Sequence, residues 1–336
     1  MLRAIVCCLL VALAGCTAGR LAMSTATESA HPVKVELRAT PFFPQDEYQC
    51  GPAALATVLS ASALEVTPED LTPVVYLPGR RGSLQTELVA AVRSHGRLPY
   101  VLLPSLDALL AEVSAGRPVL VLQKLGAGPF PGWHYAVVIG YDLGTDEVVL
   151  RSGTRERHVM AATRFLASWD RAGRWALAII KPGELPEMPE LDRYMQAAAG
   201  LEAIGDVANA TLAYQAATRQ WPAASLPRVG LANLAYAQGQ LLRAEAGYRA
   251  AIERSPGDVV ARNNRAEVLL ELGCPSLARD EIEVARMLAA GGPFAATVES
   301  SSNRIAARLA TGDADCAVNF DPGMRLSASL DYRRGD

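Results

Sequence analysis

The chain has 336 residues, a length that at roughly 100–200 residues per domain indicates two domains. Half of the residues are hydrophobic and only 20% are charged, which excludes wholesale disorder. The formal charge of −3 lacks the basic surplus of a nucleic-acid-binding protein. Six cysteines are too few for a disulfide scaffold, none forms a CxxC pair, and four histidines are spread along the chain, so neither a metal site nor another cofactor is expected.

The first 15 residues have the composition of a secretory signal. Arg3 precedes an apolar run that is too short to span a bilayer core of about 30 Å and that ends in small residues. The four residues that end at Cys16, Leu-Ala-Gly-Cys, resemble a bacterial lipobox, which implies cleavage before Cys16 and lipid on that cysteine. We therefore predict a signal peptide over residues 1–15, a membrane anchor at Cys16 and a flexible tether over residues 16–32.

The residue after the anchor gives an expected location. Thr17 stands where lipoproteins retained in the inner membrane usually carry Asp. The lipobox resemblance therefore favours the outer membrane, with the body of the protein in the periplasm.

The most informative stretch of the next part of the chain surrounds Cys50. From Pro52 onward the apolar residues keep helical spacing, so Cys50 is expected at the N-terminus of a helix. A thiol there lies near unpaired backbone N–H groups and the positive end of the helix dipole, and both favour the thiolate. Gln45, five residues earlier, has a side-chain amide that can join the Cys50 backbone N–H in holding an oxyanion.

The second candidate is a histidine at the start of a predicted strand. His134 follows a Gly- and Pro-rich loop over residues 126–132 and precedes the apolar strand 135–141. A histidine at the mouth of a strand, beside such a loop, is well placed to meet a cysteine carried by a helix.

Gln45, the run from Cys50 to Leu55 and the sequence Trp-His-Tyr around His134 resemble the motifs of the C39-like peptidases, papain-like cysteine peptidases related to the domain that trims bacteriocin leaders. The resemblance covers about residues 33–181. It implies an α+β papain-like fold, with the cysteine on a helix that packs on an antiparallel sheet bearing the histidine. It further implies Cys50 as nucleophile, His134 as general base and Gln45 as oxyanion stabiliser. The expected strands are residues 33–37, 118–123, 135–141, 147–151 and 175–181.

The residue that would orient the imidazole departs from the Asp or Asn usual in this family. If Tyr141 pairs with Glu147, His134 faces Thr154, and the acidic residue after Tyr141 is about 26 Å away at 3.3 Å per residue. The family's Asp falls at about Ser152, whose hydroxyl accepts a weaker hydrogen bond. A serine, a water or a backbone carbonyl stays open for this role, and reduced activity stays open as well.

Four further groups have weaker signals. His31 is expected in the tether, His95 at a helix C-terminus and His158 on a solvated strand. Residues 80–83, Arg-Arg-Gly-Ser, form a loop that enters a helix, and they either line the substrate cleft or make a solvated turn.

The last part of the chain repeats itself. Residues 182–190 contain three prolines and are expected to form a semi-rigid linker without regular structure. Beyond them, six sets of positions share a 34-residue period. One set is Gly205, Gly239 and Gly273. This period resembles the tetratricopeptide repeat, a helix–turn–helix unit, and predicts an all-α solenoid of three repeats over residues 191–290. Residues 291–336 then form a cap or a partly disordered tail.

These features predict a lipid-anchored thiol peptidase whose repeats offer a concave face to a protein substrate or partner. One alternative is a cell-wall stem-peptide hydrolase of the NlpC/P60 type, although those enzymes typically carry Asp-Cys-Ser-Gly where this chain has Gln-Cys-Gly-Pro around Cys50. A second is a scaffold that has lost turnover and only binds peptides or envelope proteins, for which Ser152 is the best support. Cys274 and Cys316 either form a disulfide or remain thiols.

Overall fold

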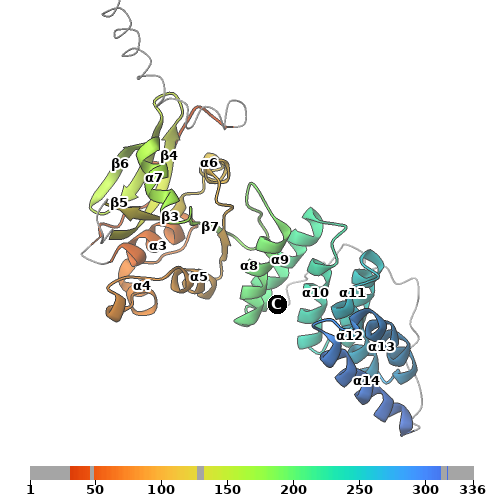
Figure 1. Cartoon of the computed structure of the whole chain (residues 1–336). Coiled ribbons are helices and arrows are strands. Elements are labelled where there is room, and N and C mark those ends of the chain that lie inside the picture. Colours follow the sequence, from red (N-terminus) through yellow and green to blue (C-terminus); the bar gives the residue numbers. More distant parts are fainter. Residues whose placement is uncertain (1–30, 46–48, 127–131, 312–315, 317–336) are drawn as a thin grey trace, which may run out of the picture. The chain divides into compact units, whose positions relative to one another are not determined.

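A computed structural model of the chain describes residues 31–45, 49–126, 132–311 and 316 (Figure 1). The predicted signal peptide, the lipidated Cys16 and the tether up to residue 30 lie outside the described residues. The described chain divides into two compact units, and the division falls between Asn209 and Ala210. Over the same residues, no helix combines the length and the apolar character that a membrane span requires.

The first unit is built on a seven-stranded sheet whose neighbouring strands all run antiparallel. Its strands are β1 (Lys34–Glu36), β2 (Leu98–Val101), β3 (Val119–Leu125), β4 (Gly132–Asp142), β5 (Glu147–Ser152), β6 (Arg155–Ala161) and β7 (Ala176–Ile180). Their order is β2-β7-β3-β4-β5-β6, and β1 pairs with the far end of β4. The five expected strands are all present. The sequence did not predict β2, in which Pro99 weakens the strand signal; β2 is an edge strand, where proline is tolerated.

The described helices of the first unit are α3 (Cys50–Ala61), α4 (Pro68–Val75), α5 (Gln85–Ser94), α6 (Leu106–Ser114), α7 (Ala162–Asp170) and α8 (Leu191–Ala203). In Figure 1, α3, α4 and α5 lie together on one side of the sheet. Buried residues of these three helices share one apolar cluster with Leu122 and other sheet residues. Side chains alternate along a strand, so Gln123 points to the opposite face, where its amide donates to Ser168 of α7 (2.8 Å). The helix with Cys50 therefore packs on an antiparallel sheet, as predicted.

The Pro-rich segment 182–190 contains no helix or strand, as predicted, but it does not coincide with the division between the units. Its backbone is hydrogen-bonded to the edge of the sheet. The Tyr100 hydroxyl donates to the carbonyl of Met188 (3.2 Å) and accepts from the N–H of Glu190 (3.0 Å). In α8, the Arg193 guanidinium donates to the carbonyl of Val101 (3.3 Å). The first helix of the predicted repeats is thus part of the first unit.

The second unit is helical. Its helices are α9 (Val207–Gln220), which spans the division, α10 (Leu226–Ala237), α11 (Leu241–Arg254), α12 (Val259–Glu271), α13 (Pro275–Ala289) and α14 (Ala295–Ala310). Each helix from α10 onward packs on the next one along the chain. The alanines that repeat every 34 residues are fully buried between these helices: Ala210, Ala244 and Ala278, and Ala217, Ala251 and Ala285. These small side chains let the paired helices approach closely, so the helix–turn–helix prediction is confirmed.

The repeated glycine lies in the turn between the two helices of each pair. Gly205, Gly239 and Gly273 have φ values of 78°, 70° and 74°, a left-handed conformation that other residues adopt at a cost. The turn therefore explains why this position repeats.

Cys274 and Cys316 form a disulfide, which resolves the alternative that the sequence left open. The Cys316 N–H also donates to the carbonyl of Gly273 (2.8 Å). Within the predicted cap, α14 buries Val298 and Ile305 against residues of α12 and α13. Residues 295–310 therefore cap the helical unit, and most of the chain after residue 311 lies outside the described part.

Candidate active site

Cys50 is the first residue of α3, as predicted, and Gln49 precedes it without a side-chain cap. The backbone N–H groups of Tyr135, Gly51 and Cys50 itself are directed at the thiol and favour its ionised form. Burial has the larger effect, however, and raises the pKa of Cys50 above its ordinary value of 9.0. The expectation that the helix terminus makes this group a thiolate is therefore not met in the resting structure.

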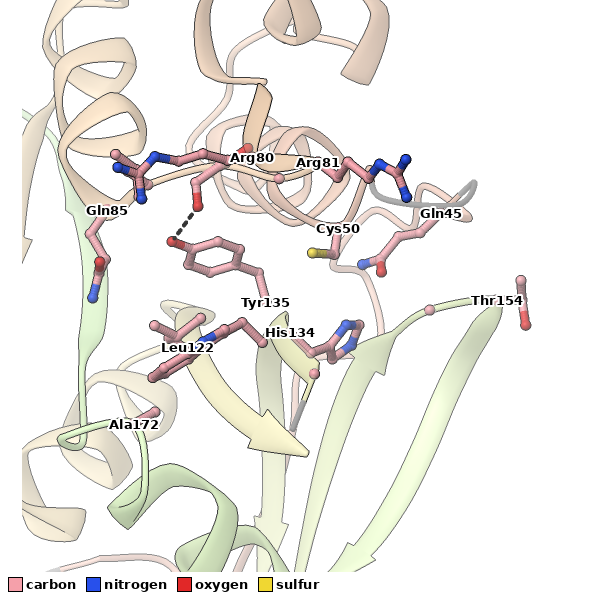
Figure 2. Close-up of a pocket in the computed structure, with 16 residues that line it drawn as sticks. Gln45, Cys50, Arg80, Arg81, Gln85, Leu122, His134, Tyr135, Thr154 and Ala172 are labelled. Carbon is pink, nitrogen blue, oxygen red and sulfur yellow. Dashed lines mark hydrogen bonds between the residues drawn. The ribbon is translucent and has the colours of Figure 1, made fainter. Parts of the chain in front are cut away.

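Three of the candidate residues line one cavity of about 940 Å³. Gln45 comes from the segment before α3, Cys50 from the start of α3, and His134 from β4. Figure 2 shows the Gln45 amide pointing toward the region between Cys50 and His134. Within the described residues, no hydrogen bond joins the Cys50 thiol to the imidazole of His134, so the two groups share a cavity without a direct bond.

The fourth candidate, Ser152, contacts the imidazole. The Nε2 atom of His134 lies 2.9 Å from the Ser152 hydroxyl at the end of β5. Burial lowers the pKa of His134 from its ordinary value of 6.5, and the nearby charge of His158 lowers it further. The imidazole is therefore neutral at neutral pH and able to accept a proton.

The strand register explains why the serine meets the histidine. At the turn, Asp142 pairs with Glu147, one residue away from the predicted pairing, so that prediction was wrong there. A bulge just before Gly140 removes the offset, and Val137 pairs with Arg151 as predicted. A side chain at Gly140 would collide with β1, since its Cβ would lie 2.5 Å from the carbonyl oxygen of Val35. The next residue of β5 after Arg151 is the serine, which thus comes close to the imidazole.

Three hydrogen bonds that the sequence did not predict hold the segment of Gln45 in place. The Gln45 N–H donates to the carbonyl of Gly153 (3.2 Å), in the turn that follows Ser152. The buried guanidinium of Arg151 donates to the carbonyls of Thr40 (2.7 Å) and Arg38 (3.0 Å). In the sequence, the sign of this role is that Arg151 is a charged residue directly after the apolar run 148–150 of the predicted strand, because a buried charge needs polar partners.

The loop before α5 lines the cavity together with the candidate residues. Arg80, Arg81, Gly82 and Ser83 belong to the lining, and both arginines are exposed, so the loop is a solvated turn that also borders the cavity. The Tyr135 hydroxyl donates to the carbonyl of Ser83 (3.3 Å), so the loop is bound to the strand that carries the histidine.

The other histidines are not among the residues that line the cavity. The His31 imidazole lies 2.7 Å from a carboxylate oxygen of Asp107, and His95 lies at the C-terminus of α5, as predicted, 2.7 Å from the carbonyl of Ala91. His158 lies on β6, as predicted. Across the described ranges, no three His, Cys, Asp or Glu side chains are grouped as metal ligands.

Residues 37–177 match the Peptidase_C39 like family. Among solved structures, a C39-like protein from Bacillus anthracis is 20% identical, with a TM-score of 0.36, over 44% of this chain and 98% of that one. No curated protein matches the chain.

Other solved structures similar to this chain are a TPR domain and a secretion chaperone. The TPR2B domain of yeast Sti1, in complex with pHsp70, is 18% identical with a TM-score of 0.34, over 35% of this chain and 97% of that one. The Yersinia enterocolitica type III secretion translocator chaperone SycD is 22% identical with a TM-score of 0.34, over 36% of this chain and 85% of that one. The chain thus combines a domain of the C39-like peptidase family, over residues 37–177, with a helical region of tetratricopeptide-like repeats.

Proposed function

We propose that this protein is a cysteine peptidase that hydrolyses peptide bonds with Cys50 as nucleophile and His134 as general base. The match to the C39-like family supports peptidase chemistry at the level of the family. The observation that carries the assignment is that Cys50, His134 and Gln45 line one cavity, with the cysteine at a helix N-terminus.

The proposed first step is acylation of the thiol. The Nδ1 atom of the imidazole accepts the thiol proton while Nε2–H donates to Ser152, and the sulfur attacks the carbonyl carbon of the scissile bond. The backbone N–H of Cys50 and the amide of Gln45 donate to the oxyanion. The imidazolium then returns its proton to the leaving amine, the carbon–nitrogen bond breaks, and an acyl-enzyme remains.

In the second step water releases the product. His134 takes a proton from the water, whose oxygen attacks the thioester carbonyl, and the sulfur leaves with the proton restored to it. No cofactor takes part in this proposal.

The proposal is tested with the soluble protein that begins at residue 17. We expect the unmodified protein to cleave members of a mixed synthetic peptide library, detected by mass spectrometry. The variants Cys50→Ala and His134→Ala should lose at least about 1,000-fold in kcat/KM, since each removes a participant in the bond-breaking step. Cleavage that survives Cys50→Ala would refute the assignment.

A scaffold without turnover is the second candidate, and it rests on a specific observation. The hydroxyl of Ser152 occupies the position next to the imidazole at which a carboxylate or an amide would orient it more strongly. In that case the chain binds peptides without cleaving them, and the unmodified protein and Cys50→Ala behave alike in the library experiment.

We also propose that the protein is anchored by lipid at Cys16 to the outer membrane and faces the periplasm. The lipobox-like sequence before Cys16 supports this. The disulfide between Cys274 and Cys316 supports an oxidising compartment. Metabolic labelling with a palmitate analogue, compared between the unmodified chain and Cys16→Ser, tests the anchor.

The repeats are proposed to recruit a peptide or protein partner. Stacked helix pairs of this kind present extended surfaces to other chains, which supports the assignment. Crosslinking in cells is compared between the full chain and a chain that ends at residue 209. If the repeats bind the partner, only the full chain should form the crosslinked complex.

A further inference from the structure

We infer that the cleft selects peptides with an acidic side chain close to the scissile bond, and that Arg80 is the residue that recognises it. This inference rests on the proposed peptidase function. It concerns the substrate class, which neither the family match nor the catalytic residues specify.

The loop that carries Arg80 has a defined backbone. Residues 78–80 form a short 3-10 helix, and Leu77 and Gly82 form an isolated β-bridge in which the Leu77 N–H donates to the Gly82 carbonyl (2.9 Å). Arg81 closes the 3-10 turn in the left-handed conformation, with φ 47° and ψ 49°. A non-glycine residue there is strained by roughly 1–2 kcal/mol, so the surrounding structure must favour this conformation.

The loop is also packed directly against the nucleophile's helix. A Cβ added to Gly51 would lie 2.3 Å from the Ser83 hydroxyl oxygen, so the loop approaches α3 as closely as a glycine allows. On its other side the Ser83 carbonyl accepts from the Tyr135 hydroxyl (3.3 Å). Because the loop contacts both the Cys50 helix and the His134 strand, its backbone holds the two arginine residues at fixed positions in the lining of the cavity.

The described lining of the cavity carries charge of one sign. Arg80 and Arg81 line the cavity, and among its described lining residues there is no Asp or Glu. In Figure 2 the Arg80 side chain extends toward Gln85 and the Arg81 side chain toward Gln45, with Cys50 between the two directions. A peptide that crosses Cys50 therefore passes a guanidinium.

Arg80 itself is exposed, and its guanidinium makes no hydrogen bond or ion pair with any residue in the described ranges. A guanidinium presents paired donors that match a carboxylate, so an acidic side chain of the substrate satisfies it with two charge-assisted hydrogen bonds. Across the cavity the exposed ring of Trp133 carries Lys124 at 5.1 Å from its centroid, which adds to the positive potential. A basic peptide would be repelled by the same groups.

The test uses internally quenched peptides in sets that differ only by Glu, Gln or Lys at one of three positions on each side of the cleaved bond. We expect the soluble protein to prefer the Glu peptide at one or more positions by about tenfold in kcat/KM over Gln. Arg80→Gln should remove that preference, so that the Glu and Gln peptides are cleaved with about equal kcat/KM. Arg80→Glu should favour the Lys peptide instead. The control is Arg38→Gln, which removes an exposed arginine outside the cavity lining.

A second measurement separates this inference from the proposed function. The variant Cys50→Ser is titrated with peptides of the same sequences that carry a fluorophore and no quencher, and binding is followed by anisotropy without any turnover. Selective binding of Glu peptides that requires Arg80 supports the inference even if no peptide is cleaved. In that case only the peptidase assignment is refuted. Equal binding or equal cleavage of Glu and Gln peptides overturns the inference, whether or not cleavage occurs.

The acidic residues Asp46 and Glu47 follow Gln45 in the sequence and lie outside the described residues. The cleavage and binding experiments are therefore repeated with the double variant Asp46→Asn, Glu47→Gln. If the preference for Glu peptides is unchanged or rises in this variant, Arg80 acts on the substrate as inferred. If the preference vanishes, these residues rather than Arg80 determine selectivity, and the inference is wrong.

Discussion

At the scale of single residues, burial opposes the chemistry that the sequence suggests for Cys50. Backbone N–H groups stabilise its thiolate, but burial raises its pKa, and burial likewise lowers the pKa of His134. Both groups are thus neutral at neutral pH. The proposed mechanism is therefore general-base catalysis from a thiol and a neutral imidazole rather than attack by a thiolate formed in advance.

This predicts the pH profile of kcat/KM. Activity should fall on the acid side as His134 becomes protonated, with an apparent pKa below the ordinary 6.5, because its pKa is lowered. It should fall on the alkaline side as the thiol loses its proton, with an apparent pKa above 9.0, because the pKa of Cys50 is raised. His158→Gln removes a charge that lowers the pKa of His134 and should move the acid limb to higher pH. An alkaline limb well below 9.0 would instead indicate a thiolate–imidazolium pair.

Ser152 supports a second prediction at this scale. A carboxylate beside the imidazole accepts its N–H more strongly than a hydroxyl and stabilises the imidazolium that forms during acylation. Ser152→Asp should therefore raise kcat by about tenfold, and Ser152→Ala should lower it. Single-turnover kinetics on one peptide measures both. A lower kcat for Ser152→Asp together with unchanged activity for Ser152→Ala would show that this side chain does not orient the histidine.

At the scale of elements, the site depends on close approaches between backbone segments that are distant in sequence. The loop before α5 lies against the first turn of α3, and the bulge in β4 sets which residue of β5 reaches the imidazole. Glycines stand at both places, since a Cβ at Gly51 or Gly140 would meet a neighbour at 2.3 or 2.5 Å. These contacts couple the stability of the domain to the geometry of the cleft.

Gly51→Ala tests this coupling. The added methyl group forces Ser83 and its loop away from α3, and after allowing for the better helix propensity of alanine we expect a loss of about 1 kcal/mol in the free energy of unfolding. Urea denaturation measures it. Adding Ser83→Gly should restore stability, and Gly79→Ala, where no atom lies within 4 Å of the new Cβ, is the control. Equal stability of Gly51→Ala and the unmodified protein would show that the loop moves without cost.

At the scale of the whole molecule, the first unit extends past its sheet. Met188 and Glu190 of the segment 182–190 are the partners of the Tyr100 hydroxyl, and the Glu187 N–H donates to the buried carboxylate of Glu112 (2.6 Å). Ending the unit before the Pro-rich segment would remove these partners and leave buried polar groups unsatisfied.

A fragment that ends at residue 181 should accordingly be less stable than one that ends at residue 209, by about 3 kcal/mol or more. Thermal or urea unfolding of the two fragments, both beginning at residue 31, gives the difference. Tyr100→Phe in the longer fragment isolates the contribution of the hydroxyl. If the two fragments unfold alike, the Pro-rich segment acts as a linker, as the sequence alone predicts.

The sequence by itself determined the features that depend on local periodicity. The spacing of apolar and small residues predicts the helix that begins at Cys50, the strand that follows His134 and the 34-residue helical period. Local spacing carries no information on what each element packs against. Only the tertiary structure decided the direction of the thiol pKa, the contact between Ser152 and the imidazole, and the inclusion of residues 80–83 in the cleft, because each depends on burial or on segments far apart in the chain.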